Sequence, residues 1–174
     1  MKVRAVQATT ALVVTLILLF GGYFAFQWLK VEKPLQAYIQ THSELTIVDQ
    51  AISPNHIELS LKASPSFDAT SYRALYQQME EIGGHREITI RFVDNENSSL
   101  QSAWEQISFL MYEYISLEQY GEIPPAVERI STLHGVEGEV VMDEKAIYLL
   151  LQLEEEVAFY RLPLLKSVTG GEQE

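Results

Sequence analysis

The pattern of apolar and polar positions divides the chain into an uncharged N-terminal stretch and a longer region of short alternating elements. The stretch from Ala5 to Leu29 carries no charged side chain. At about 1.5 Å of rise per residue, roughly 20 helical residues cross a hydrocarbon core of about 30 Å. Backbone groups in hydrocarbon need partners within the same segment, which favours a helix. The pattern therefore predicts a transmembrane helix over residues 5–29, which binds the membrane, after a cytoplasmic N-terminus of residues 1–4.

A cleaved signal peptide is the main alternative for this stretch. It requires a shorter apolar core followed by small residues at a cleavage site. Here the apolar run ends in bulky side chains, including Tyr23 and Trp28, which suit the membrane interface. We therefore expect an uncleaved, single-pass signal-anchor. Lys and Arg number two on each side, and the free amine tips the topology toward a cytoplasmic N-terminus, with the C-terminal domain outside the cell membrane.

The remaining pattern predicts an α+β domain over residues 45–166. A juxtamembrane helix or linker is expected over residues 30–44, and a flexible tail over residues 167–174. Period-two alternation predicts strands near residues 45–52, 56–62, 86–94, 136–142, 146–153 and 156–162, and helical spacing predicts helices near 69–82, 99–120 and 124–134. The order β-β-α-β-α-α-β-β-β predicts a two-layer α/β sandwich. A single helix between the second and third strands favours a parallel crossover.

Several residues are expected to mark helix boundaries. Asp68 is placed to cap the helix that begins at residue 69, and the pair Gly83-Gly84 to end it. Gly121 is expected to stop the long helix, and Gly135 the short one after it. The run AIYLLLQL near residue 146 is apolar on both faces for most of its length, which predicts a central strand.

Charge excludes several classes of partner. The 10 Lys and Arg residues from Lys30 onward stand against 24 Asp and Glu residues, a formal charge of −14. Phosphate binding needs clustered cations, so no nucleic acid is expected as a partner, nor a polybasic grip on anionic lipid. The absence of cysteine from the sequence excludes disulfides, lipoprotein anchoring and a cysteine nucleophile.

The clearest metal-like spacing lies between the third strand and the long helix. Asp94, Glu96 and Glu105 fall at positions one, three and twelve of a calcium loop. Ser99 replaces the glycine that such a loop needs at position six, so we favour turn and N-cap roles for these side chains. His42, His56, His85 and His134 lack ligand spacing. The sequence predicts no metal site and no cofactor.

The carboxylates Glu105 and Glu113 lie two helical turns apart and share their helix with Tyr112, as a saccharide cleft would require. A solvated helix face explains them equally well. No GxSxG, SxxK or phosphate-binding glycine loop occurs in the sequence. We therefore predict no enzyme and no catalytic residue.

One segment resembles a known group of proteins. The sequence ITIRFVDNENSSLQSAWEQISFLMYE, from Ile88 to Glu113, is similar to a segment of uncharacterised single-pass membrane proteins of Gram-positive spore-forming bacteria. The shared features are a leading membrane helix, a strand ending in Asp94-Asn95 and a Leu-rich aromatic helix. The resemblance implies a place in the bacterial envelope and no particular activity.

The favoured hypothesis is a non-catalytic, extracytoplasmic domain for protein–protein interaction. Its partner would be another envelope protein or further copies of itself, bound at the edge of the terminal hairpin through Val157, Phe159 and Tyr160. A second hypothesis is an envelope sensor that binds a small ligand or cation between sheet and long helix, near Trp104 and Tyr112. A cell-envelope hydrolase is the third.

Overall fold

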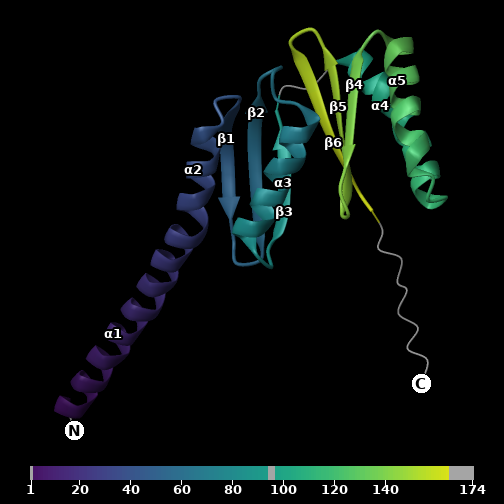
Figure 1. Cartoon of the computed structure of the whole chain (residues 1–174). Helices are drawn as coiled ribbons and strands as arrows, with labels where there is room; N and C mark the ends of the chain where they lie inside the picture. Colours follow the sequence, from purple (N-terminus) through teal and green to yellow (C-terminus); the bar gives the residue numbers. More distant parts are fainter. Residues whose placement is uncertain (1, 94–96, 165–174) are drawn as a thin grey trace, which may run out of the picture.

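The computed structural model describes residues 2–93 and 97–164, together with their side chains except those of residues 2–11 and 24. The chain begins with helix α1 (Lys2–Gln27), continues through one π-helical turn, η1 (Trp28–Glu32), and enters α2 (Lys33–Thr41). Both junction residues are helical, with φ and ψ of −60° and −46° at Gln27 and −64° and −47° at Lys33. The three segments therefore form one uninterrupted rod (Figure 1).

The first sheet, sheet A, follows the rod. Strands β1 (Leu45–Ile52), β2 (His56–Ala63) and β3 (Glu87–Phe92) lie in the order β1-β2-β3. β1 pairs with β2 antiparallel through a bulge between Ile47 and Asp49, and β2 pairs with β3 parallel. Parallel neighbours need a crossover connection, and α3 (Ala69–Gly83) supplies it. The predicted parallel crossover is confirmed.

The second half of the chain forms sheet B and two helices. Helix α4 (Ser98–Ser116), a short 3-10 turn, η2 (Tyr120–Glu122), and α5 (Ile123–His134) precede β4 (Glu137–Met142), β5 (Ala146–Leu153) and β6 (Glu156–Pro163). The three strands are antiparallel in the order β4-β5-β6. Residues 146–151 of β5 are all buried, as predicted for a central strand covered on both faces.

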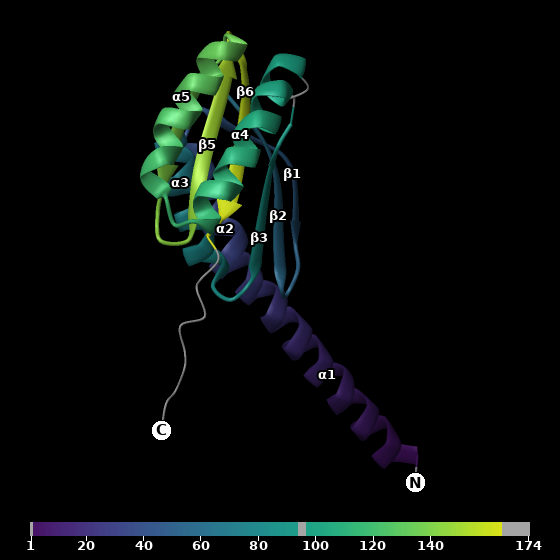
Figure 2. The same cartoon turned by 90° about the vertical axis from the view of Figure 1, so that its right-hand side faces the viewer.

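The helices divide between the faces of the two sheets. α2 and α3 cover one face of sheet A, where Leu59 and Leu61 are fully buried. α3 also reaches sheet B, because its Tyr72 packs against Tyr148 of β5. α4 and α5 cover the opposite face of sheet B (Figure 2). The mixed α+β class is confirmed, and the strands divide into two separate three-stranded sheets. The predicted two-layer sandwich is not confirmed.

Aromatic rings join the two halves. Phe159 of β6 lies 4.3 Å from Phe92 of β3, measured between ring centroids, and 5.2 Å from Tyr72 of α3. Phe67, which precedes α3, meets Phe159 edge-on at 5.5 Å. Such pairs add about 0.5–1.5 kcal/mol each beyond the burial of their area. This cluster, together with Tyr148, holds sheet B against sheet A.

Individual capping residues determine where several helices begin and end. Asp68 accepts a hydrogen bond from the backbone N–H of Ser71 at 2.7 Å, which confirms the predicted N-cap. Gly84 and Gly135 have φ of 64° and 66°, the conformation for which glycine is preferred after a helix. Both predicted helix ends are confirmed.

The predicted end of α4 at Gly121 is wrong, because the helix ends at Ser116. Glu118 adopts φ of 56° there. Its N–H donates to Ile115 O at 3.2 Å, and the N–H of Gln119 donates to Tyr114 O at 2.8 Å. This pair of bonds is the Schellman motif, which usually has glycine at the position of Glu118. A helix stop without glycine left no signal in the sequence.

Candidate functional site

The junction between α1 and the domain is built from buried helix residues. Val31, Leu35 and Ile39 are almost completely buried in the core shared by sheet A and α3. At the end of α1, the side-chain amide Nε2 of Gln27 also donates a hydrogen bond to Ile52 O at the end of β1, at 3.4 Å. The rod is therefore packed into the domain over about three turns, and it is not joined to the domain by a loose linker.

The part of the rod before this junction is apolar and exposed. Among the described residues, one helical stretch, Leu12–Thr41, contains a window long and apolar enough to cross a membrane, and none of that window is buried. The exposed side chains include Leu18, Leu19 and Phe20. A signal sequence near the N-terminus meets the same minimum length and hydropathy, so this observation alone supports an association with a membrane without deciding between anchor and leader.

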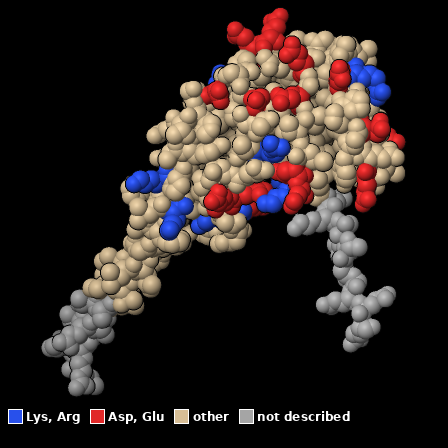
Figure 3. Space-filling view, viewed as in Figure 1, with Lys and Arg blue, Asp and Glu red and all other residues tan. Residues whose placement is uncertain are grey.

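A groove of about 920 Å³ lies between α3, the start of β3 and the turn that joins β4 to β5. It lies at the lower end of the domain, where acidic and basic groups form a mixed band (Figure 3). Glu80 of α3 accepts a hydrogen bond from Lys145 and lies 3.5 Å from the guanidinium of Arg161. That guanidinium stacks over the ring of Tyr76, 4.6 Å from its centroid. The hydrogen bond to Glu80 raises the pKa of Lys145.

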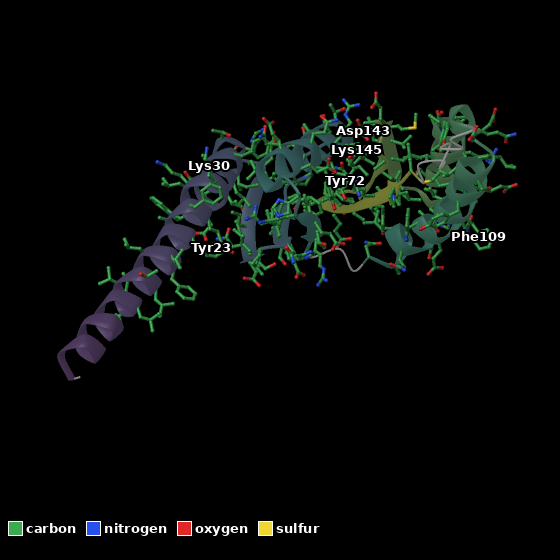
Figure 4. All side chains as sticks on the ribbon, turned by 90° about the horizontal axis from the view of Figure 1, so that it is seen from below. Tyr23, Lys30, Tyr72, Phe109, Asp143 and Lys145 are labelled. Carbon is green, nitrogen blue, oxygen red and sulfur yellow. The ribbon has the colours of Figure 1, made fainter. Side chains whose placement is uncertain are left out.

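Asp143, in the β4–β5 turn, completes this network. Its carboxylate accepts hydrogen bonds from Gln77 Nε2 and the hydroxyl of Tyr148, both at 3.1 Å, and from the backbone N–H groups of Lys145 and Ala146. Partial burial opposes ionisation, but these donors outweigh it and lower the pKa of Asp143. Figure 4 shows Asp143 and Lys145 next to each other in the turn that joins β4 to β5. The charged groups of the groove thus tie α3 to sheet B.

The calcium-like positions are only partly described. Asp94 and Glu96 lie outside the described residues, and Glu105 is exposed on α4. No group of three or more His, Asp or Glu side chains within residues 2–93 and 97–164 is arranged to hold a metal ion. Asn97 instead caps α4, accepting from the N–H of Ser99 at 2.8 Å, which is the turn and N-cap chemistry that the sequence favoured for this loop.

The predicted interaction residues fall into three environments. Val157 is buried, and Phe159 belongs to the aromatic cluster between the sheets. Tyr160 stacks on Trp104 with 3.8 Å between ring centroids and 5° between ring planes. Tyr112 is exposed on the outer side of α4. The structure therefore brings Tyr160 and Trp104 together and leaves Tyr112 apart from them. Binding at the backbone edge of β6 stays a prediction.

Sequence reasoning missed the most exposed aromatic residue of the domain. Phe109 of α4 keeps 83% of its surface exposed, and Leu117, directly after the helix, keeps 56%. The signal was present in the helical spacing: the stripe of Leu100, Ile107 and Met111 turns inward, and Phe109 does not lie on it. Beyond the end of α4, Tyr114, Glu118, Tyr120 and Glu122 line a hollow of about 410 Å³.

Comparison with known proteins finds no matching family model, no matching curated protein and no matching solved structure. The function of this chain is therefore inferred from its own geometry.

Proposed function

We propose that this chain is a membrane-anchored domain that presents a protein-interaction surface on the outer side of the bacterial cell membrane, without catalysis. The observation that carries the proposal is the continuity of the exposed apolar helix with α2, whose buried face is part of the domain core. A leader peptide is removed after export, and it has no need to be continuous with a core helix. A permanent anchor benefits from this continuity, because it fixes the height and orientation of the domain above the bilayer.

The topology in the proposal has the N-terminus in the cytoplasm and the acidic domain outside. Lys2 and Arg4, directly before the apolar stretch, suit a cytoplasmic N-terminus, and Lys30 and Lys33 equal them in number on the other side. The formal charge of −14 after residue 29 makes adhesion of the domain to anionic lipid unfavourable, so that the domain stands away from the surface.

The non-catalytic part of the proposal is supported by the contacts that charged side chains make within the groove at Glu80. Its best-positioned charged groups, Glu80, Asp143 and Arg161, are occupied by contacts within the chain. A catalytic group must instead be free to reach a reacting atom.

Membrane fractionation and protease protection test the proposal. The full-length chain with a C-terminal epitope is expected to stay in carbonate-washed membranes at its full mass, and externally added protease is expected to remove the domain from intact protoplasts. Recovery of a chain trimmed near residue 30 from the culture medium would identify a secreted protein instead. Protection of the epitope in intact protoplasts, with digestion after lysis, would place the domain in the cytosol.

The volume of the groove favours the sensor hypothesis as a second candidate. A hollow of about 920 Å³ lined by both carboxylates and cations is large enough for a small zwitterionic ligand. A thermal-shift series on the full chain in detergent, with calcium, sugars and muropeptides, tests it. A shift that disappears in the Glu81→Gln variant would support the sensor hypothesis, and equal melting temperatures under all conditions would count against it.

A further inference from the structure

The second half of α4 is apolar on its exposed side as well as its buried side. Ile107 and Met111 are each 1% exposed in the core of sheet B, whereas Phe109 and Tyr112 are 83% and 61% exposed. A helix on the surface of a soluble domain normally carries one apolar stripe, directed at the core. We call Phe109, Tyr112 and Leu117 the α4 patch. Large apolar groups gathered on one exposed helix are typical of a binding surface.

The segment of the chain that carries the α4 patch is acidic. Glu105 and Glu113 are exposed on the same helix, and the sequence has no Lys or Arg between Arg91 and Arg129. The last turn of α4 contains no basic residue, although a helix C-terminus bears a partial charge of about −0.5 that favours a cation.

A hollow follows α4 directly, beginning next to Leu117 in the chain. Two tyrosines, Tyr114 and Tyr120, and two carboxylates, Glu118 and Glu122, line it. Aromatic faces and carboxylates together attract an ammonium or guanidinium group. The volume of about 410 Å³ is sufficient for a Lys or Arg side chain.

We infer that the α4 patch and the adjoining hollow dock an amphipathic segment of another protein that is rich in Lys and Arg. Its apolar side covers Phe109 and Tyr112, and one of its cations enters the hollow at Glu118. This inference rests on the proposed function, because it names the partner of the anchored domain. The Lys and Arg side chains of such a segment are complementary in charge to the carboxylates of this surface, which is why we name this occupant.

Two other occupants fit the surface less well. A second copy of the chain would bring the same carboxylates face to face, and like charges at an interface are strongly unfavourable. An anionic membrane is repelled for the same reason. Phe109 also lies at the end of the domain opposite Tyr23 and α1 (Figure 4), so the α4 patch is far from the bilayer that holds the rod.

The test measures binding of a designed peptide to the full chain in phosphatidylcholine nanodiscs. The probe is a fluorescent amphipathic Lys/Leu helix, with a Glu/Leu helix of the same pattern as its matched control and empty nanodiscs as background. We expect the Lys/Leu peptide to bind and the Glu/Leu peptide not to bind. Phe109→Ser should raise the Kd at least about tenfold, as loss of an interface anchor does. Glu118→Gln should raise the Kd several-fold.

The control variant is Val48→Ser, which removes an apolar side chain that is 56% exposed on β1, away from the α4 patch. It should leave the Kd within about twofold, as expected for a residue outside the interface. Circular dichroism checks that each variant is folded. If Phe109→Ser and Val48→Ser give the same Kd, binding follows total charge and the inference is wrong.

Cross-linking without peptide tests the rival occupant. A dimer that Phe109→Ser abolishes would assign the α4 patch to a second copy and overturn the inference. The proposed function is judged separately, because protease protection and membrane retention do not depend on the peptide. A correctly anchored chain whose Kd is unchanged by Phe109→Ser would contradict the inference and leave the proposed function intact.

Discussion

Gly138 of β4 gives the sharpest test of the packing of sheet B. A Cβ atom added there would lie 2.2 Å from Ser131 Oγ and 2.9 Å from Val127 Cγ1, both on α5. Ser131 is almost completely buried, and its Oγ has no hydrogen-bond partner among the described residues. The serine must therefore rotate, or α5 must move away from the strand, to accept an alanine at position 138.

The magnitude follows from two opposing effects. Overpacking of a filled core costs about 1–3 kcal/mol. Replacing glycine by alanine within a strand returns roughly 0.5–1 kcal/mol of conformational entropy. Gly138→Ala should therefore lower the free energy of unfolding by about 1 kcal/mol, roughly the difference between the midpoints of these two ranges. Urea titration of the full chain in detergent, followed by tryptophan fluorescence, measures this change.

Gly121→Ala is the matched control, because an added Cβ at Gly121 meets no atom within 4 Å. It should change the unfolding free energy by no more than about 0.5 kcal/mol. In a Ser131→Gly background, the penalty of Gly138→Ala should shrink by at least about 0.5 kcal/mol, since the two side chains compete for one space. Equal effects of Gly138→Ala and Gly121→Ala, or a penalty unaffected by Ser131→Gly, would refute the reasoning.

Four further outcomes are expected. Glu118→Gly should raise the unfolding free energy in urea by about 1 kcal/mol, because left-handed backbone costs other residues about 1–2 kcal/mol; no gain would mean that its carboxylate makes a compensating contact. Asp68→Ala should lower that free energy by about 1 kcal/mol through loss of the cap. Hydrogen bonds from the backbone and side chain of Ser71 lower the pKa of Asp68. The contribution of Asp68 to the unfolding free energy is therefore present above about pH 4 and is lost as the pH falls through the pKa of the folded state. This loss should be absent when Asp68→Ala is titrated with acid. Burial raises the pKa of Tyr148 to about 12. The folded state therefore keeps the phenolic proton and loses stability as the pH rises from about 10 toward 12. Tyrosinate absorbance should show a group that titrates late and that is missing in Tyr148→Phe. Glu80→Gln should lower the melting temperature more than Lys145→Ala, because Glu80 also faces the half-buried Arg161. The exposed Lys145 contributes less than about 1 kcal/mol. The reverse order of melting temperatures would contradict the structural role of the groove.

Features decided by a few neighbouring residues could be predicted from the sequence. Asp68 and Gly135 mark helix boundaries because their side chains, or the lack of one, act on the adjacent backbone. The burial of β5 on both faces could be predicted from its run of neighbouring apolar residues. The end of α4 could not be predicted, since Glu118 takes a conformation that the sequence assigns to glycine.

Features decided by distant pairing could not be predicted. The sequence does not state which strand edges meet, so the division into two sheets is visible only in the structure. Phe159 was expected on a surface edge, but its ring lies between Phe92 and Tyr72, contributed by elements more than 60 residues earlier in the chain. Of the surface residues, Tyr112 was named from the sequence, and Phe109 needed the exposed side of α4 to be known.

The rod formed by α1, η1 and α2 has a consequence for how the length of the chain can vary. Each residue inserted or deleted between the apolar stretch and Val31 would turn the domain by about 100° around the rod and move it about 1.5 Å along it. Insertion of seven residues, about two full turns, would return the domain to nearly the same bearing at a greater height. Insertion or deletion of two residues would point the α4 patch in nearly the opposite direction. The number of residues between the apolar stretch and Val31 therefore determines which way the α4 patch faces around the rod.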